Sequence, residues 1–160
     1  YLVDSYNMIV LDTQKEQIYF RKHKKYRCST FKEVADQVYF DETYMKKYMY
    51  GLALTAFLWP NHAAMHDFFV RTFPKGRKGA YLEIGPGHGY YFRTAALLGN
   101  FDHMMGIDIS ATSVALTRDL VGHLGARTEA KIEIVEKDFL EMESGTLLTP
   151  ALLWAKCSSM

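Results

Sequence analysis

The sequence predicts an α/β fold, in which a cap of helices precedes a parallel sheet. Three observations predict this class. Residues 80–139 alternate between strand-like and helix-like segments, and a glycine-rich loop connects the first strand to the first helix. The residues before that strand carry apolar side chains at helical spacing. Strands that alternate with helices are typical of a parallel sheet with right-handed crossovers.

Helices are predicted in the cap, residues 1–78. Residues 30–33, Thr-Phe-Lys-Glu, form a capping box that opens a short helix. Asp41 is predicted to cap a second helix, and Pro60 closes that helix because proline cannot continue a hydrogen-bonded turn. Asn61 is predicted to cap a third helix. The first segment of the chain fits either a hairpin or one long helix, and its pattern leaves both open.

The loop after the first strand is the most informative segment. The strand, Ala80–Ile84, runs into glycines at alternate positions, Gly85, Gly87 and Gly89. Glycine lets backbone N–H groups approach a ligand without interference from a Cβ atom, and the N-terminus of the next helix favours negative charge. The spacing differs from the dinucleotide-binding pattern Gly-x-Gly-x-x-Gly, because the third glycine comes one residue early.

An acid stands at the end of each of the three predicted strands. Glu83 lies two residues before the first loop glycine, Asp108 ends the second strand, and Asp138 follows the third. Each acid alone also fits a structural role, as a strand residue facing water, a helix cap or a turn residue. Their order and position together favour a ligand site at one edge of the sheet.

The predicted helices agree with this arrangement. The first runs from His88 to Leu98, and Gly99 can close it. Ser110 is predicted to cap the second, which Gly125 ends. Its apolar stripe consists of Leu116, Leu120 and Leu124.

These segments resemble the class I S-adenosylmethionine-dependent methyltransferases, whose first motif reads acid-x-Gly-x-Gly-x-Gly. The resemblance implies a Rossmann-like domain over residues 79–142 that binds S-adenosylmethionine. It implies that Glu83 and the glycine loop surround the methionine part of the cofactor, that the second strand end meets the ribose and adenine, and that the third strand end meets the adenine edge. The implied cofactor-binding residues are Glu83, Gly85, Pro86, Gly87, His88, Gly89, Asp108, Ile109, Asp138 and Phe139.

The resemblance covers only the first three strands of the methyltransferase fold. The tail, residues 143–160, lacks the aspartate that usually starts the family's fourth strand, and its apolar run at residues 151–155 fits either a strand or a helical turn. We therefore expect the first strand to lack a neighbour on one side. A longer chain, a homo-oligomer or partner chain, or the tail folding back would complete the sheet.

Composition limits the classes of partner. The net charge of the 160 residues is +1, which gives no electrostatic reason to expect nucleic acid or a membrane as partner. The longest apolar stretch, around residues 48–59, is too short to span a membrane. Cys28 and Cys157 lie far apart and form neither a disulfide framework nor a metal cluster, so we expect no metal and a cytoplasmic location.

The first functional hypothesis is a methyltransferase that transfers a methyl group to N or O of a small-molecule acceptor. Such an enzyme needs a general base only when the acceptor must lose a proton. His62, His66, Tyr48 and Tyr50 are candidates, and none is assigned. Two alternatives stay open. Asp108 would also suit the ribose of NAD(P) in an oxidoreductase, and a truncated methyltransferase-like domain could serve only to bind a partner.

Overall fold

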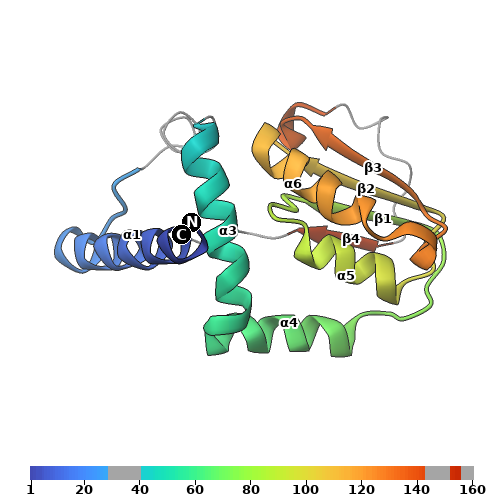
Figure 1. The fold of residues 1–160 in the computed structure, drawn as a ribbon, viewed down its shortest axis with the longest axis horizontal. Coiled ribbons are helices and arrows are strands. Elements are labelled where there is room, and N and C mark those ends of the chain that lie inside the picture. Colours follow the sequence, from blue (N-terminus) through green and yellow to red (C-terminus); the bar gives the residue numbers. More distant parts are fainter. Residues whose placement is uncertain (29–40, 143–151, 156–160) are drawn as a thin grey trace.

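The computed structural model describes residues 1–28, 41–142 and 152–155, the last of these by their backbone alone. A parallel sheet with its helices forms one part of the molecule; of the described cap helices, α4 runs alongside this part and α1 extends away from it (Figure 1). The predicted capping-box helix at residues 30–40 lies outside the described residues.

The sheet has four parallel strands in the order β3-β2-β1-β4. Their bounds are β1 Ala80–Ile84, β2 His103–Asp108, β3 Lys131–Glu136 and β4 Leu152–Ala155. Because all strands run in one direction, their carboxyl ends meet at a single edge. The predicted α/β class and its three strands are therefore confirmed.

The fourth strand corrects one expectation. β4 pairs with β1, so that Tyr81 lies beside Leu152 and Ile84 beside Ala155. The expectation that β1 lacks a neighbour on that side was wrong. The apolar run of the tail supplies a strand, which hydrogen-bonds to backbone groups that an open edge would leave without a partner.

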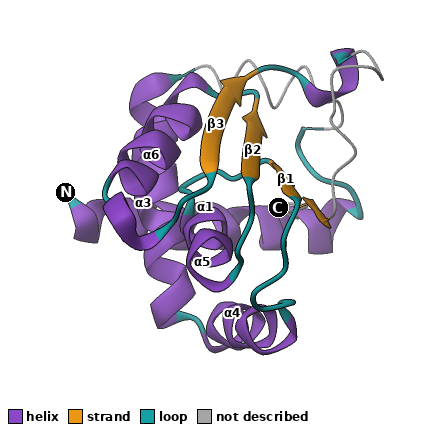
Figure 2. Ribbon diagram, turned by 90° about the vertical axis from the view of Figure 1, so that its right-hand side faces the viewer, coloured by secondary structure: helices purple, strands orange, loops and turns teal. Residues whose placement is uncertain are grey.

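Two helices follow β1 and β2 and cover one face of the sheet (Figure 2). They are α5, Tyr90–Leu98, and α6, Ala111–Gly122. Ser110 caps α6 as predicted, since its Oγ accepts a hydrogen bond from the Ser113 N–H at 3.3 Å. α5 begins two residues later than predicted, because Gly89 has a left-handed φ of 79° and cannot belong to a right-handed helix.

Three helices of the cap are described. They are α1 Leu2–His23, α3 Glu42–Leu58 and α4 Pro60–Thr72. The first segment is thus one long helix rather than a hairpin. Asp41 caps α3 as predicted, through a 2.9 Å hydrogen bond from the Tyr44 N–H to its Oδ1. The prediction for Asn61 was wrong: α4 begins at Pro60, because proline fits the first position of a helix.

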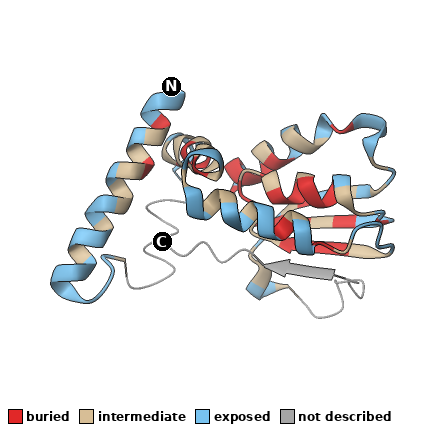
Figure 3. Ribbon diagram, turned by 90° about the horizontal axis from the view of Figure 1, so that it is seen from below, coloured by how far each residue is buried: buried red, intermediate tan, exposed pale blue. Residues whose placement is uncertain are grey.

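α1 crosses α3 at close range near its N-terminal end. Ser5 and Ile9 are its buried residues, and Gly51 of α3 faces them, so that a Cβ atom at this glycine would clash with the backbone carbonyl of Ser5. The rest of α1 is largely exposed (Figure 3). The Tyr44 hydroxyl donates to Asp12 at 2.9 Å, and burial together with that carboxylate raises the pKa of Tyr44.

The core lies between the sheet and the helices α4, α5 and α6. Its members are mostly aromatic or aliphatic side chains that contact one another across these elements. They include Phe69, Phe73, Tyr81, Phe92, Met104, Val114 and Ile134. Among the described residues, none of the helices combines the length and the hydropathy that crossing a membrane requires.

Candidate cofactor site at the carboxyl ends of the strands

The glycine loop, residues 85–89, connects β1 to α5 at the carboxyl edge of the sheet. Gly85, Gly87 and Gly89 have φ angles of 69°, 61° and 79°, which L side chains rarely adopt. The Gly85 N–H donates to the carbonyl of Ile107 at 2.8 Å, and the Gly89 N–H donates to the carbonyl of Pro86 at 2.9 Å. The left-handed backbone conformation of the loop therefore explains why all three positions are occupied by glycine.

Asp108 ties this loop to the next helix. One carboxylate oxygen accepts the Gly87 N–H at 3.0 Å, and the other accepts the Ser110 N–H at 3.0 Å. The side chain is only 9% exposed. Because hydrogen bonds to a charged acceptor are the stronger ones, Asp108 fixes the position of the glycine loop relative to the N-terminus of α6.

The loop is also packed tightly on both sides. A Cβ atom at Gly89 would lie 3.0 Å from the Thr117 Cα of α6, and one at Gly87 would lie 3.3 Å from the Met49 Sδ of α3. The Thr117 hydroxyl donates to the Gly87 carbonyl at 3.0 Å. Thr117 and Met49 therefore pack against the candidate site, and the sequence pattern pointed to neither residue. A buried Thr on a leucine-rich helix carries no local signal of such a contact.

Glu83 lies deeper than the loop. It is fully buried on the face of β1 that packs against α5, and one of its oxygens accepts the Tyr81 hydroxyl at 2.7 Å. Burial raises the pKa of the Tyr81 hydroxyl, and the charge of Glu83 raises it further. The structure thus pairs Glu83 with a core tyrosine beneath the loop.

The other predicted residues stand around the same edge. Ile109 is half-buried between Asp108 and Ser110. Asp138 follows β3, whose last residue pairs with Asp108 in the sheet. The Asp138 Oδ1 accepts the Leu140 N–H at 2.8 Å and so caps a short 3-10 helix, η3, Phe139–Glu141. Asp138 and Phe139 are both half-buried.

Pro86 and His88 complete the loop. Pro86 is fully buried, and the His88 Nδ1 accepts the N–H of Tyr90 at 3.2 Å. With this bond, the N–H groups of Gly85, Gly87, Gly89 and Tyr90 all donate to acceptors within the protein.

The four candidate bases lie in different surroundings. The Tyr48 ring stacks on Tyr44, and the Tyr50 ring meets Tyr1 edge-on, so both are near the α1–α3 crossing. The His62 Nδ1 lies 2.8 Å from the Thr55 hydroxyl inside the cap. His66 is the candidate that contacts α5.

In the described part of the chain, acidic, cysteine and histidine side chains form no group of three that could hold a metal ion. A comparison with models of known protein families finds no match, and a search of curated proteins finds none either. The geometry of the site and the sequence pattern therefore carry the functional argument.

Proposed function

We propose that this chain is an S-adenosylmethionine-dependent methyltransferase that acts on a small-molecule acceptor at N or O. The carboxyl edge of the sheet is where open α/β folds bind nucleotide-like cofactors. The glycine loop, Asp108 and Asp138 gather at that edge. Their spacing resembles that of the methyltransferases rather than that of the dinucleotide-binding enzymes.

One observation favours this cofactor over NAD(P). A dinucleotide is held by its pyrophosphate, which accepts hydrogen bonds from N–H groups of the loop and of the helix N-terminus. Here the N–H groups of Gly85, Gly87, Gly89 and Tyr90 already donate within the protein. S-Adenosylmethionine has no phosphate and does not require those donors.

The residues present fit the parts of that cofactor. Asp108 ends β2 at the edge where the ribose of the cofactor would lie, and a carboxylate oxygen is the acceptor that a ribose hydroxyl requires. Phe139 and Ile109 are half-buried side chains at the neighbouring strand ends, where an adenine ring would be held. When bound, the cofactor supplies an activated methyl group. The protein contributes orientation of the two reactants and exclusion of water.

Calorimetric titration with S-adenosylhomocysteine and with NAD tests the proposal. We expect saturable binding of the first and none of the second. Asp108→Ala should abolish the binding. Asp102→Ala is the matched control, because Asp102 also accepts a backbone N–H, that of Gly79 at 3.2 Å, but at the amino edge of the sheet. Circular dichroism establishes that both variants are folded. Binding of NAD alone would overturn the proposal and favour an oxidoreductase.

A further inference from the structure

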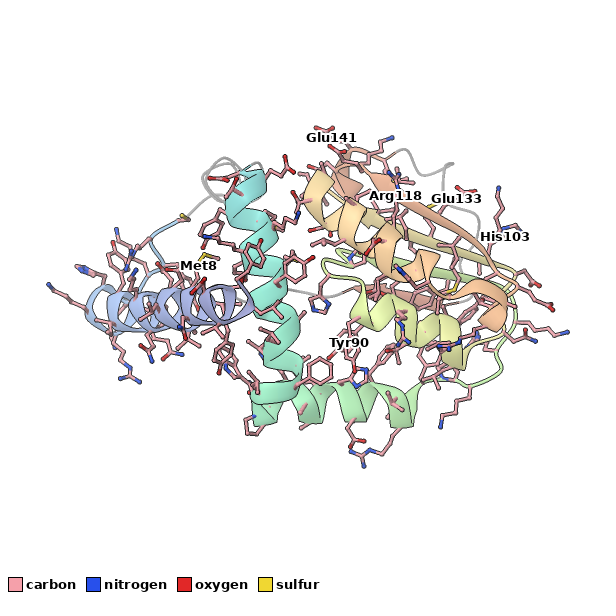
Figure 4. The ribbon with its side chains drawn as sticks, viewed as in Figure 1. Met8, Tyr90, His103, Arg118, Glu133 and Glu141 are labelled. Carbon is pink, nitrogen blue, oxygen red and sulfur yellow. The ribbon has the colours of Figure 1, made fainter. Side chains whose placement is uncertain are left out.

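Four aromatic rings meet at the start of α5 and form what we call the Tyr90 cluster: Phe57, His66, His88 and Tyr90. His66 stacks on Tyr90 with 4.4 Å between ring centroids and 26° between the planes. Phe57 and His88 lie 5.5 Å and 6.3 Å from the same ring. The cluster joins α3, α4, the glycine loop and α5, and Figure 4 shows Tyr90 where these helices come together.

The cluster lies at the rim of the proposed cofactor site. Tyr90 directly follows Gly89, the last glycine of the loop. α3 passes the loop at Met49, whose Sδ would lie 3.3 Å from a Cβ atom at Gly87. Phe57 lies eight residues further along α3, about 12 Å along the helix axis. The cluster therefore borders the glycine loop through His88 and Tyr90, and Phe57 is its member farther from Met49.

The hydrogen bonds of His66 define which of its nitrogens can accept. The Thr94 hydroxyl donates its single proton to the Tyr90 carbonyl at 2.8 Å. The His66 Nε2 lies 3.2 Å from the same hydroxyl oxygen and must therefore carry a hydrogen and donate it. In the neutral ring this leaves Nδ1 as an acceptor, and within the described residues no hydrogen bond engages Nδ1. Burial lowers the pKa of His66, which favours the neutral ring.

The chemistry of the cluster indicates its ligand. Phe57 keeps 66% of its surface exposed although it contacts Tyr90, so most of its ring can receive another ring. Tyr90 and His88 are half-buried. The four residues of the cluster include no carboxylate that could pair with a cationic ligand. Aromatic surfaces with one neutral acceptor suit an uncharged planar ring that can donate a hydrogen bond.

We propose that the Tyr90 cluster binds the methyl acceptor, and that the acceptor is a planar aromatic compound with a hydroxyl group that donates to Nδ1 of His66. This assignment rests on the proposed methyltransferase function and narrows it to a class of substrate. Phe57 and Tyr90 hold the ring by stacking, and His66 is a positioning residue that orients the hydroxyl group.

Fluorine NMR of 4-fluorophenol tests the assignment through binding alone. With the chain saturated with S-adenosylhomocysteine, we expect broadening and a shift of the fluorine signal, and no competition from cyclohexanol. Phe57→Leu should weaken binding about three- to ten-fold, the usual range for loss of an aromatic pair. Phe68→Leu is the matched control, since Phe68 is 58% exposed on α4 and outside the cluster. His66→Phe should weaken binding of 4-fluorophenol but not of fluorobenzene.

Each contrary result has a definite meaning. Binding of S-adenosylhomocysteine without binding of 4-fluorophenol would mean that the cluster is not the acceptor site. Equal weakening of 4-fluorophenol binding by Phe68→Leu and Phe57→Leu would mean the same. Neither result would affect the proposed function. If His66→Phe weakens the binding of 4-fluorophenol and of fluorobenzene equally, His66 does not accept a hydrogen bond from the acceptor. If 4-fluorophenol binds to a chain that does not bind S-adenosylhomocysteine, both the proposed function and the acceptor assignment fail.

Discussion

Asp108 shows how a single side chain can serve the fold and a ligand together. From the sequence it was predicted to meet the ribose of a cofactor, and the structure adds two backbone hydrogen bonds, to Gly87 and Ser110. A pattern of residue types indicates that an acid is required at a strand end. It does not reveal how many backbone groups that acid holds, because one of the two partners, Gly87, lies 21 residues away in the chain.

Replacement of Asp108 should therefore reduce stability as well as binding. We expect Asp108→Ala to lower the free energy of unfolding by about 1–3 kcal/mol, since it leaves two nearly buried N–H groups without their acceptor. Urea denaturation measures this change. Asp102→Ala should lower the free energy of unfolding clearly less, because the hydrogen bond that it removes is exposed. Equal losses in the two variants would show that Asp108 does not fix the loop.

Two glycines allow the cost of a left-handed φ angle to be measured apart from the cost of a steric clash. Gly89 and Gly76 have similar left-handed φ angles, 79° and 68°. A Cβ atom at Gly89 would press on the Thr117 backbone at 3.0 Å, whereas one at Gly76 has no atom within 4 Å. Gly76→Ala should thus lower the free energy of unfolding by about 1–2 kcal/mol because of its φ angle alone. Gly89→Ala should lower it further, because the clash with Thr117 is added. Thermal unfolding of the two variants would contradict this if their melting temperatures were equal.

His66 should make the stability depend on pH. Its pKa is lowered by burial, while the nearby charge of Asp67 acts in the opposite direction. The unfolded chain therefore binds a proton at His66 more readily than the folded one. The stability is fully present above about pH 6.5, the ordinary pKa, and decreases as the pH falls below it. Urea denaturation between pH 7.5 and 5 should give a smaller decrease for His66→Gln than for the wild-type chain.

At the scale of the elements, local signals located most helices and strands but not every buried face. Caps at Asp41 and Ser110 and the strand before the glycine loop were predicted correctly. α6 ends at Gly122 rather than at the predicted Gly125, so that Leu124, which is buried, lies beyond it. Leu116 and Leu120 are half-buried, and the buried positions of α6 include Ser113 and Thr117. Small side chains let α6 approach the glycine loop closely, and this requirement arises from the tertiary contact rather than from helical periodicity.

The crossing of α1 and α3 can be tested with a second pair of glycines. Gly51→Ala would place a Cβ atom against the Ser5 carbonyl, so we expect α1 to separate from α3. Limited trypsin digestion should then cleave α1 faster than in the wild-type chain. Gly122→Ala, at the end of α6 with no atom within 4 Å, should leave the digestion unchanged. Equal cleavage in both variants would mean that this contact does not hold α1.

At the scale of the whole molecule, the sequence predicted the α/β class and the alternation of the first three strands with helices along the chain. It did not decide the pairing of β4 with β1 or the contact of Met49 with the glycine loop. Both join segments far apart in the chain. Apolar runs of four or five residues fit either helix or strand, and only the neighbouring backbone decides between them.

α3 links the two proposed ligand sites mechanically. On this one helix, Met49 faces Gly87 of the loop closely enough to exclude a Cβ atom there, and Phe57 contacts Tyr90 of the cluster. A ligand that settles the loop against Met49 therefore also restrains the ring that receives the acceptor. By thermodynamic reciprocity, each ligand should then raise the affinity for the other by the same factor. Occupancy of one site would make the second better ordered, and the chain would then favour the complex with both ligands over a complex with either one.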